Sequence, residues 1–243
     1  MLYASEREQL LDILWSLKTY QLIDCSGGAL SLRCGEHILI TTTGSAFRRW
    51  QLGPTDFIVL DADGGVVERS DRLGPAGTPI HLALYHLFPA CGAVIHAHSP
   101  YSLAFAARGR TIPSETNLLD TLGEVPCLVA DDRTVKSEVR EAGVAVEVPA
   151  GVVQRPDVYA INTRYLIPQL ANVLLHRRDE LGRHGLTFTV YRHGVFAFAR
   201  SADEAFENLV RVETSARTHI LARVIDRAGL DERVGQPTAD RGE

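Results

Sequence analysis

The order in which strand-like runs and helical segments alternate is the feature that most constrains the fold of this chain. Short runs rich in Ile, Val, Leu and Phe are bounded by turns that contain Gly or Pro. Longer segments with apolar residues at helical spacing flank them. This order predicts an α/β fold, with a mostly antiparallel sheet and helices on both sides. The strands are expected at 29–33, 37–41, 57–60, 93–96, 124–129, 144–148, 186–191 and 195–199.

Capping residues indicate where the helices begin. Ser5 with Glu8 forms the pattern of a capping box and precedes leucines at helical spacing. Ser201 with Glu204 repeats the pattern before a long helix. Thr78 has the side chain of an N-cap and is followed by proline. The predicted helices start at these three points and at residue 163, and they end near residues 17, 88, 178 and 228.

Length and composition limit the classes of protein that need consideration. The 243 residues suffice for one domain, expected over 1–228, with a disordered tail at 229–243. A net charge of -5 gives no sign of a nucleic-acid surface. No run approaches the roughly 20 apolar residues of a membrane span, and nothing resembles a signal peptide, so we expect a cytoplasmic protein without a membrane partner. None of the four cysteines forms a CxxC pair, which argues against a zinc knuckle.

The sharpest local feature is His96-Ala97-His98 at the end of an apolar run. Residues i and i+2 of a strand point to the same face, about 7 Å apart. Two imidazoles on one face can therefore bind one ion, and neutral imidazole suits several divalent metals. The alternative is a pair of unrelated histidines, one packed and one solvated.

A third ligand must come from elsewhere in the chain. His193 is followed by Gly194 and lies in a short turn between two strongly apolar runs. A polar residue held on such a rigid frame is well placed for a site. Taken without the other two histidines, His193 is better interpreted as a turn residue exposed to water.

Several short motifs, in this order along the chain, resemble the class II aldolase/adducin family. Together they span roughly residues 5–225, which is nearly the whole chain. The motifs are Gly27-Gly28-Ala29-Leu30-Ser31, Ile40-Thr41-Thr42-Thr43-Gly44, Pro79-Ile80-His81-Leu82-Ala83-Leu84-Tyr85, Ala93-Val94-Ile95-His96-Ala97-His98-Ser99 and His193-Gly194-Val195.

The resemblance implies a three-layer α/β/α fold. It also implies a homotetramer with active sites between neighbouring subunits and a small-molecule substrate. It implies one divalent metal ion (zinc, manganese or iron) on three histidines, and substrate contacts from the glycine turns. The implied metal ligands are His96, His98 and His193, and the implied substrate-binding residues are Gly28, Ala29, Thr43, Gly44 and Gly77.

The chain departs from the sugar-phosphate aldolases of that family at several positions. Gly77 stands where those enzymes have a glutamate that serves as acid/base and ancillary metal ligand. Pro75 and Ala76 replace two phosphate-binding serines, and Ala29 replaces an asparagine. Asn117 falls near the tyrosine that a neighbouring subunit donates. The metal ligands thus remain, while the carboxylate and most of the phosphate pocket are missing.

These departures favour chemistry on a substrate without phosphate. A phosphate would lose several hydrogen bonds of about 1–3 kcal/mol each. A retro-aldol reaction would lose a proton shuttle commonly worth about 10²–10⁴-fold. Decarboxylation of a hydroxy-aromatic or keto acid needs a metal with open positions as Lewis acid. Arg48 or Arg49 would suit recognition of a carboxylate, unless both are solvated.

Other interpretations stay open. A non-haem iron oxygenase acting on an arylpyruvate also needs a metal with vacant positions, and an adducin-like binding module needs no catalysis. Glu115, Asp120 or Asn117 is a candidate for the missing catalytic group across a subunit interface, although a solvated carboxylate is the simpler interpretation. His81 is more typical of helix packing, and Cys25 of a small buried residue.

Overall fold

One mixed sheet organises the part of the chain that the computed structural model describes, namely residues 1–24, 28–42, 51–129 and 163–228. Its eight described strands lie in the order β4-β3-β2-β1-β5-β8-β7-β6. All neighbouring pairs are antiparallel except β6 and β7, so the predicted α/β fold with a mostly antiparallel sheet is confirmed. The strands are β1 (Ala29–Cys34), β2 (His37–Thr41), β3 (Phe57–Leu60), β4 (Val66–Glu68), β5 (Ala93–Ala97), β6 (Cys127–Leu128), β7 (Leu186–Val190) and β8 (Gly194–Ala199).

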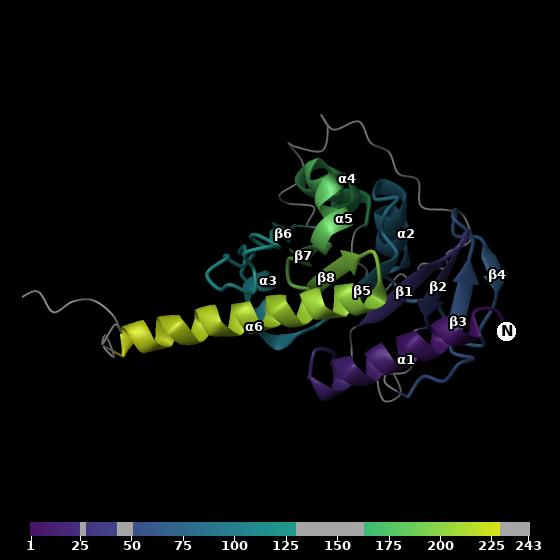
Figure 1. Ribbon diagram of the computed structural model, residues 1–243, viewed down its shortest axis with the longest axis horizontal. Helices are drawn as coiled ribbons and strands as arrows, with labels where there is room; N and C mark the ends of the chain where they lie inside the picture. The colour runs from purple at the N-terminus through teal and green to yellow at the C-terminus, as the bar shows by residue number, and fades with distance from the viewer. Residues whose placement is uncertain (25–27, 43–50, 130–162, 229–243) are drawn as a thin grey trace, which may run out of the picture.

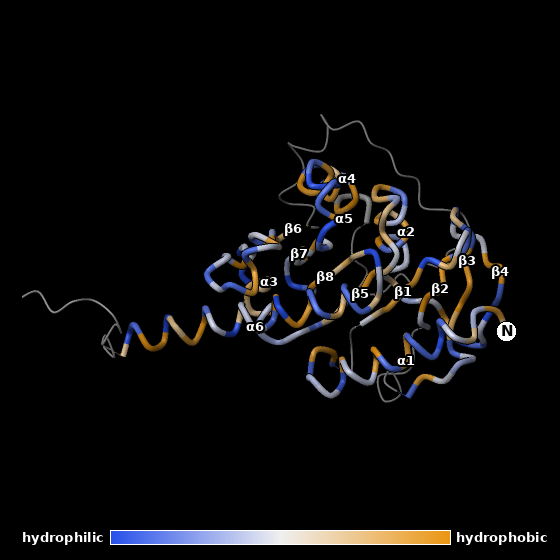
Figure 2. Tube along the Cα trace, viewed as in Figure 1, coloured by the Kyte–Doolittle hydropathy of each residue, from blue (hydrophilic) through white to orange (hydrophobic). Residues whose placement is uncertain are grey.

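Helices cover both faces of the sheet, which gives three layers (Figure 1). Alternate residues of each strand face opposite sides. In β5, Ile95 therefore packs with α1, α3 and α6, whereas Val94 packs with α2, α4 and α5. Hydrophobic and hydrophilic residues alternate along α1 and α6, as expected for helices with one buried side (Figure 2). The helices are α1 (Ala4–Thr19), α2 (Thr78–Leu87), α3 (Pro100–Ala106), α4 (Thr163–Leu174), the 3-10 helix η1 (Leu175–Glu180), α5 (Leu181–His184) and α6 (Ala202–Arg227).

The start of α1 differs from the prediction. The helix begins at Ala4, Tyr3 is the N-cap in a left-handed conformation, and its side chain makes no capping hydrogen bond. The predicted capping box at Ser5 is therefore wrong. The fully buried Arg7 instead anchors this end, because its guanidinium donates to the carbonyls of Leu2 and Pro54 and to the carboxylate of Glu68.

Other element ends also differ from the prediction. Gly77, and not Thr78, is the N-cap of α2, and the Thr78 hydroxyl donates to the Pro75 carbonyl. The strand predicted at 124–129 is reduced to β6 and an isolated bridge at Val125. Val125 pairs only with Ile112 of the loop after α3, whereas β6 pairs with β7. The helix predicted to run to residue 178 becomes η1 after Leu174. The strand predicted at 144–148 and the tail at 229–243 lie outside the described residues.

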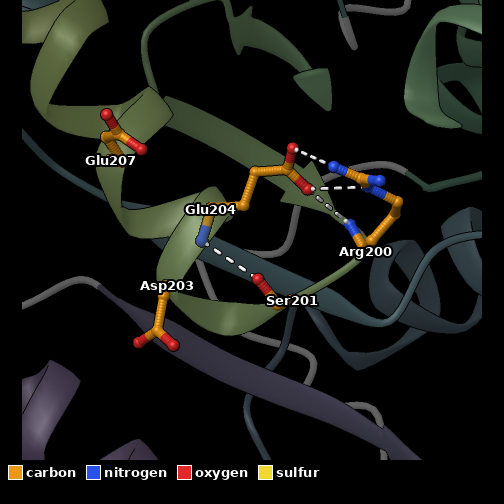
Figure 3. A pocket seen from close by; sticks show the side chains of 5 residues that line it. All are labelled: Arg200, Ser201, Asp203, Glu204 and Glu207. Atoms are coloured by element: carbon orange, nitrogen blue, oxygen red, sulfur yellow. Dashed lines mark hydrogen bonds and ion pairs between the residues drawn. The ribbon is translucent and has the colours of Figure 1, made fainter. Parts of the chain in front are cut away.

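Ser201 is the N-cap of α6, as predicted, although the Glu204 carboxylate bonds Arg200 and not the Ser201 N–H of a full capping box. Ser201 Oγ accepts a hydrogen bond from Glu204 N (Figure 3). The Glu204 carboxylate accepts hydrogen bonds from the backbone N–H and the guanidinium of Arg200. With Asp203 and Glu207, these residues line an open surface depression at the end of β8. The helix then runs to Arg227 and extends beyond the body of the sheet (Figure 1).

The ends of three central strands meet at the other end of β8, away from the start of α6. Ala29 at the start of β1 pairs with His96 near the end of β5, and Val195 near the start of β8 pairs with Ala97. Residues just outside these ends are thereby brought together. In the part of the chain that the structure describes, no helix is long and apolar enough to cross a membrane.

Candidate metal centre

His96 and His98 come from the end of β5. His96 is 5% exposed and lies on the sheet face that α2 covers, where its ring stacks on Phe196 with centroids 4.2 Å apart. His98 follows the strand by one residue and is half-buried. Their ring centroids are 5.0 Å apart. The two imidazoles therefore lie on the same side of the strand, as the HxH pattern predicts.

His193 comes from the hairpin between β7 and β8. Val190 pairs with Gly194, which leaves a three-residue loop of Tyr191, Arg192 and His193. Arg192 has a φ of 55°, in the left-handed region, and its N–H donates to the Ala106 carbonyl. This turn directs the His193 ring back over the end of β5, where it stacks on His96 at a centroid distance of 4.8 Å.

The three rings converge on one point. His193 Nε2 lies 3.0 Å from His96 Nε2, and one ligand atom from each of the three histidines lies within 4.8 Å of the others. Nitrogens that bind zinc tetrahedrally at about 2.0–2.1 Å are separated by roughly 3.3 Å. The spacing is therefore compatible with one shared cation.

Hydrogen bonds to the other ring nitrogens orient two of the ligands. His96 Nδ1 lies 3.0 Å from the Val195 carbonyl, to which only a protonated Nδ1 can donate. The neutral ring then presents a lone pair at Nε2, as metal-binding imidazoles usually do. His98 Nδ1 lies 3.3 Å from Asp24 Oδ1. A carbonyl and a carboxylate behind the imidazoles are typical partners of metal-ligating histidines.

Burial keeps the His96 and His193 imidazoles neutral near pH 7. Burial, followed by the charges that His193 and His98 would carry, holds the pKa of His96 well below its usual value. Burial and the nearby His98 lower the pKa of His193 to about 4. Neutral rings have the lone pairs that ligation requires, so the donor set fits a divalent cation.

Gly194 allows the rings to approach so closely. A Cβ at this position would lie 2.5 Å from the Ala97 carbonyl oxygen, 2.9 Å from His96 Cε1 and 2.9 Å from His98 Cδ2. Since real Cβ contacts under 3.0 Å essentially never occur, any larger residue would displace the rings or the hairpin.

The first glycine turn also lies beside the histidines. Gly28 has a φ of 128°, and a Cβ there would lie 3.6 Å from the His96 carbonyl oxygen and 3.2 Å from Ile23. Ala29 is buried and pairs with His96 in the sheet. Both predicted substrate-binding residues are thus next to the centre. The predicted residues Thr43, Gly44 and Arg48, and Cys25, lie outside the described part of the chain.

Gly77 caps α2, which covers the same sheet face as the His96 ring. A Cβ at Gly77 would meet no atom within 4 Å, so space is open where the related aldolases are expected to carry a carboxylate. One turn further along, His81 is fully buried, and its Nδ1 lies 2.7 Å from Ser31 Oγ. Burial lowers the pKa of His81 to about 3, so this imidazole is neutral.

Glu115 and Asn117 are not brought to the histidines within one chain. Glu115 Oε2 is hydrogen-bonded to His219 Nδ1 of α6 at 2.5 Å, and Arg223 lies 3.8 Å from the other carboxylate oxygen. Asn117 is exposed in the same loop, whose Leu119 packs on the sheet face of α1 and α6. That face is opposite to the His96 ring. A catalytic role for either residue requires a second subunit.

Two residues of the centre escape sequence reasoning. Asp24 lies in a DCSGG turn whose composition signals only a change of direction. Gly194 is visible as a turn glycine, but nothing local indicates that it lies against two imidazoles. Both contacts join segments that are far apart in the chain.

The fold and this site together define a class, that of three-layer α/β/α proteins with a histidine cluster at the ends of the central strands. Comparison with known proteins makes the class specific. Residues 8–220 match the model of the Class II Aldolase and Adducin N-terminal domain. The chain therefore belongs to the class II aldolase/adducin family.

Individual relatives cover most of the chain. It is 30% identical over 227 residues to the L-ribulose-5-phosphate 4-epimerase UlaF of Salmonella paratyphi B, covering 91% of this chain and 87% of the relative. Among solved structures, an L-fuculose 1-phosphate aldolase has a TM-score of 0.66 at 21% identity, covering 98% of this chain and 93% of that one. YgbL of Escherichia coli, described as a candidate aldolase, epimerase or decarboxylase, has a TM-score of 0.66 at 23% identity, covering 98% and 96%.

Proposed function

We propose that this protein is a divalent-metal-dependent carbon–carbon lyase, most simply a decarboxylase, that acts on a non-phosphorylated hydroxy-aromatic or keto acid. The single observation that carries the proposal is the convergence of three imidazoles on one point. The proposed ligands are His96, His98 and His193, and the proposed ion is zinc, manganese or iron.

The chain's own residues support this choice of substrate. Gly77 and Ala29 provide neither a carboxylate nor an amide at positions where the related sugar-phosphate enzymes are expected to have them. An aldol or epimerisation step needs a group that moves a proton. Within the described residues of one chain, Glu115 is hydrogen-bonded to His219 of α6, on the other face of the sheet. Loss of carbon dioxide does not require a base to start the reaction.

The residues around the histidines have identifiable roles in such a reaction. The Val195 carbonyl and the Asp24 carboxylate hold His96 and His98 in the orientation for ligation. Gly77 carries no side chain, and a Cβ there would meet no atom within 4 Å. Arg48 is our proposed partner for a substrate carboxylate. A bound divalent ion would supply Lewis-acid stabilisation of the enolate that remains after carbon dioxide leaves.

We further propose a homotetramer with active sites between neighbouring subunits, as the resemblance to the family implies; in that assembly Glu115 and Asn117 are the candidates for a group contributed across the interface. Family relatives with named activities act on sugar phosphates, namely L-ribulose 5-phosphate and L-fuculose 1-phosphate. That reaction is the main competitor for this chain, and an activity test must include it.

The test is a comparison of product formation by the full-length protein loaded separately with zinc, manganese and iron. Carbon dioxide release from a panel of hydroxy-aryl and keto acids, lost in His193→Ala, supports the proposal. The exposed His86→Ala, on α2, is the matched control and should keep full activity.

Epimerisation or cleavage of a sugar phosphate without carbon dioxide release would overturn the choice of reaction. Dioxygen consumption with an arylpyruvate would overturn it in favour of an oxygenase. A protein that binds no metal would overturn the enzyme proposal in favour of a binding module.

A further inference from the structure

A buried carboxylate of α6 fastens the chain directly after the metal-binding strand. Glu213 is only 9% exposed. One of its oxygens accepts a hydrogen bond from Tyr101 N at 2.8 Å, and the other accepts from Ser102 N at 2.8 Å and from Ser102 Oγ at 2.7 Å. These donors belong to the second and third residues of α3, and α3 begins at Pro100, two residues after His98.

These bonds replace the usual cap of α3. A helix leaves its first N–H groups without partners inside the helix, and the N-cap side chain usually accepts from one of them. The N-cap Ser99 makes no such hydrogen bond, and Pro100 has no N–H. Glu213 therefore satisfies both remaining N–H groups of the first turn from another helix. A carboxylate also interacts favourably with the positive end of the peptide dipoles there.

The position of α3 bears directly on His98. His98 is the residue directly after β5, which ends at Ala97. Only Ser99 separates it from the first residue of α3, so movement of the α3 start moves the His98 backbone as well. On the other side of the same helix, Arg192 N bonds the carbonyl of Ala106, the last residue of α3. α3 thus contacts both the segment that carries His98 and the hairpin that carries His193.

We propose that Glu213 is a positioning residue for the metal centre, acting through the start of α3 to hold His98 in line with His96 and His193. The proposal rests on the function proposed above, because it assumes that the three histidines bind a cation. Glu213 itself contacts neither the histidines nor a substrate. Its predicted effect is on the geometry and affinity of metal binding.

The experiment uses cobalt(II) as the probe with the full-length protein. Cobalt affinity is measured by competition with a chelator, and ligand geometry by the visible absorption of the bound ion. Glu213→Gln places an NH₂ group opposite backbone or hydroxyl donors, so we expect about tenfold weaker binding and an altered spectrum. Ser102→Ala removes one of the three bonds and should weaken binding less. Glu207→Gln, on an exposed turn of the same helix, is the matched control and should bind as the wild type does.

The outcomes separate this proposal from the one on which it rests. If the wild type binds no cobalt, the metal centre itself is wrong. If the wild type binds cobalt and Glu213→Gln binds it with the same affinity and spectrum, Glu213 has only a structural role and the positioning proposal is wrong, even when the melting temperature falls. Should Glu213→Gln fail to fold, Ser102→Ala decides: an unchanged affinity and spectrum in that variant overturns the proposal.

Discussion

Gly194 shows how a residue without a side chain determines the geometry at the scale of single residues. The histidines supply the ligand atoms, but their spacing depends on the β8 backbone lying against the His96 and His98 rings. From strand geometry alone, the HxH pattern predicted that the imidazoles of His96 and His98 lie on one face. Nothing in the local sequence predicted the contact of Gly194 with those rings, because it depends on how β5 and β8 pair.

We expect Gly194→Ala to weaken metal binding by about tenfold or more, as loss of ligand orientation does elsewhere. The added Cβ would have to displace a carbonyl oxygen or two imidazole rings. Chelator competition measures the affinity. Gly182→Ala in α5, where a Cβ meets nothing within 4 Å, is the control and should bind normally. An unchanged affinity in Gly194→Ala would contradict the packing argument.

At the scale of helices and strands, buried polar side chains connect neighbouring elements. Arg7 joins the start of α1 to the loop before β3 and to β4, and Glu213 joins α6 to α3. The sequence patterns locate most elements but do not predict these side-chain contacts between them. Capping rules succeeded at Ser201, where the partners are three residues apart, and failed at Ser5, where Arg7 and Glu68 decide the helix start.

The Arg7–Glu68 pair predicts a pH dependence of stability. The Leu2 N–H, followed by the Arg7 charge, lowers the pKa of Glu68 below its usual 4.5 in the folded state. Its contribution is therefore fully present above pH 4.5 and is lost as the pH falls through the lower folded value. We expect Glu68→Gln to lower the free energy of unfolding by about 1–3 kcal/mol at pH 7, because the substitution leaves the buried Arg7 without its carboxylate partner. Urea titration measures the difference. The difference between variant and wild type should shrink below pH 4.5, and a difference independent of pH would contradict the argument.

The cap of α6 predicts a smaller, local effect. Ser201→Ala removes the acceptor of the Glu204 N–H and should lower the free energy of unfolding by about 1 kcal/mol. Ser201→Asp keeps an acceptor in place and should be close to the wild type. Thermal denaturation of the three proteins measures the difference. Equal stability of the alanine and aspartate variants would mean that the cap does not contribute.

The centre joins distant parts of the fold at the scale of the whole molecule. His96 and His193 are 97 positions apart in the chain, yet their nitrogens lie 3.0 Å apart because β5 and β8 are neighbours in the sheet. A cation bound there would link the middle of the sheet to the β7–β8 hairpin. Binding to the folded state alone stabilises it by mass action.

We therefore expect saturating zinc to raise the melting temperature. An excess of 100 times the dissociation constant corresponds to about 2.7 kcal/mol. A chelator should reverse the shift, and His193→Ala should abolish it. The exposed His86→Ala should retain it. A shift of the same size in His193→Ala would place the zinc elsewhere on the protein.

The sequence by itself determined the kinds of element, most of their positions and the pairing of His96 with His98 on one strand face. These properties follow from periodicity and from turn residues, which act over a few positions. The sequence also offered His193 as the third histidine, and the structure brings its ring to the other two. The tertiary structure alone decided that Asp24 and Val195 orient the rings and that Glu213 holds the chain after His98. Each of these contacts depends on which strands and helices become neighbours. That choice is made by burial of two core layers on opposite faces of the sheet, to which residues from the whole chain contribute.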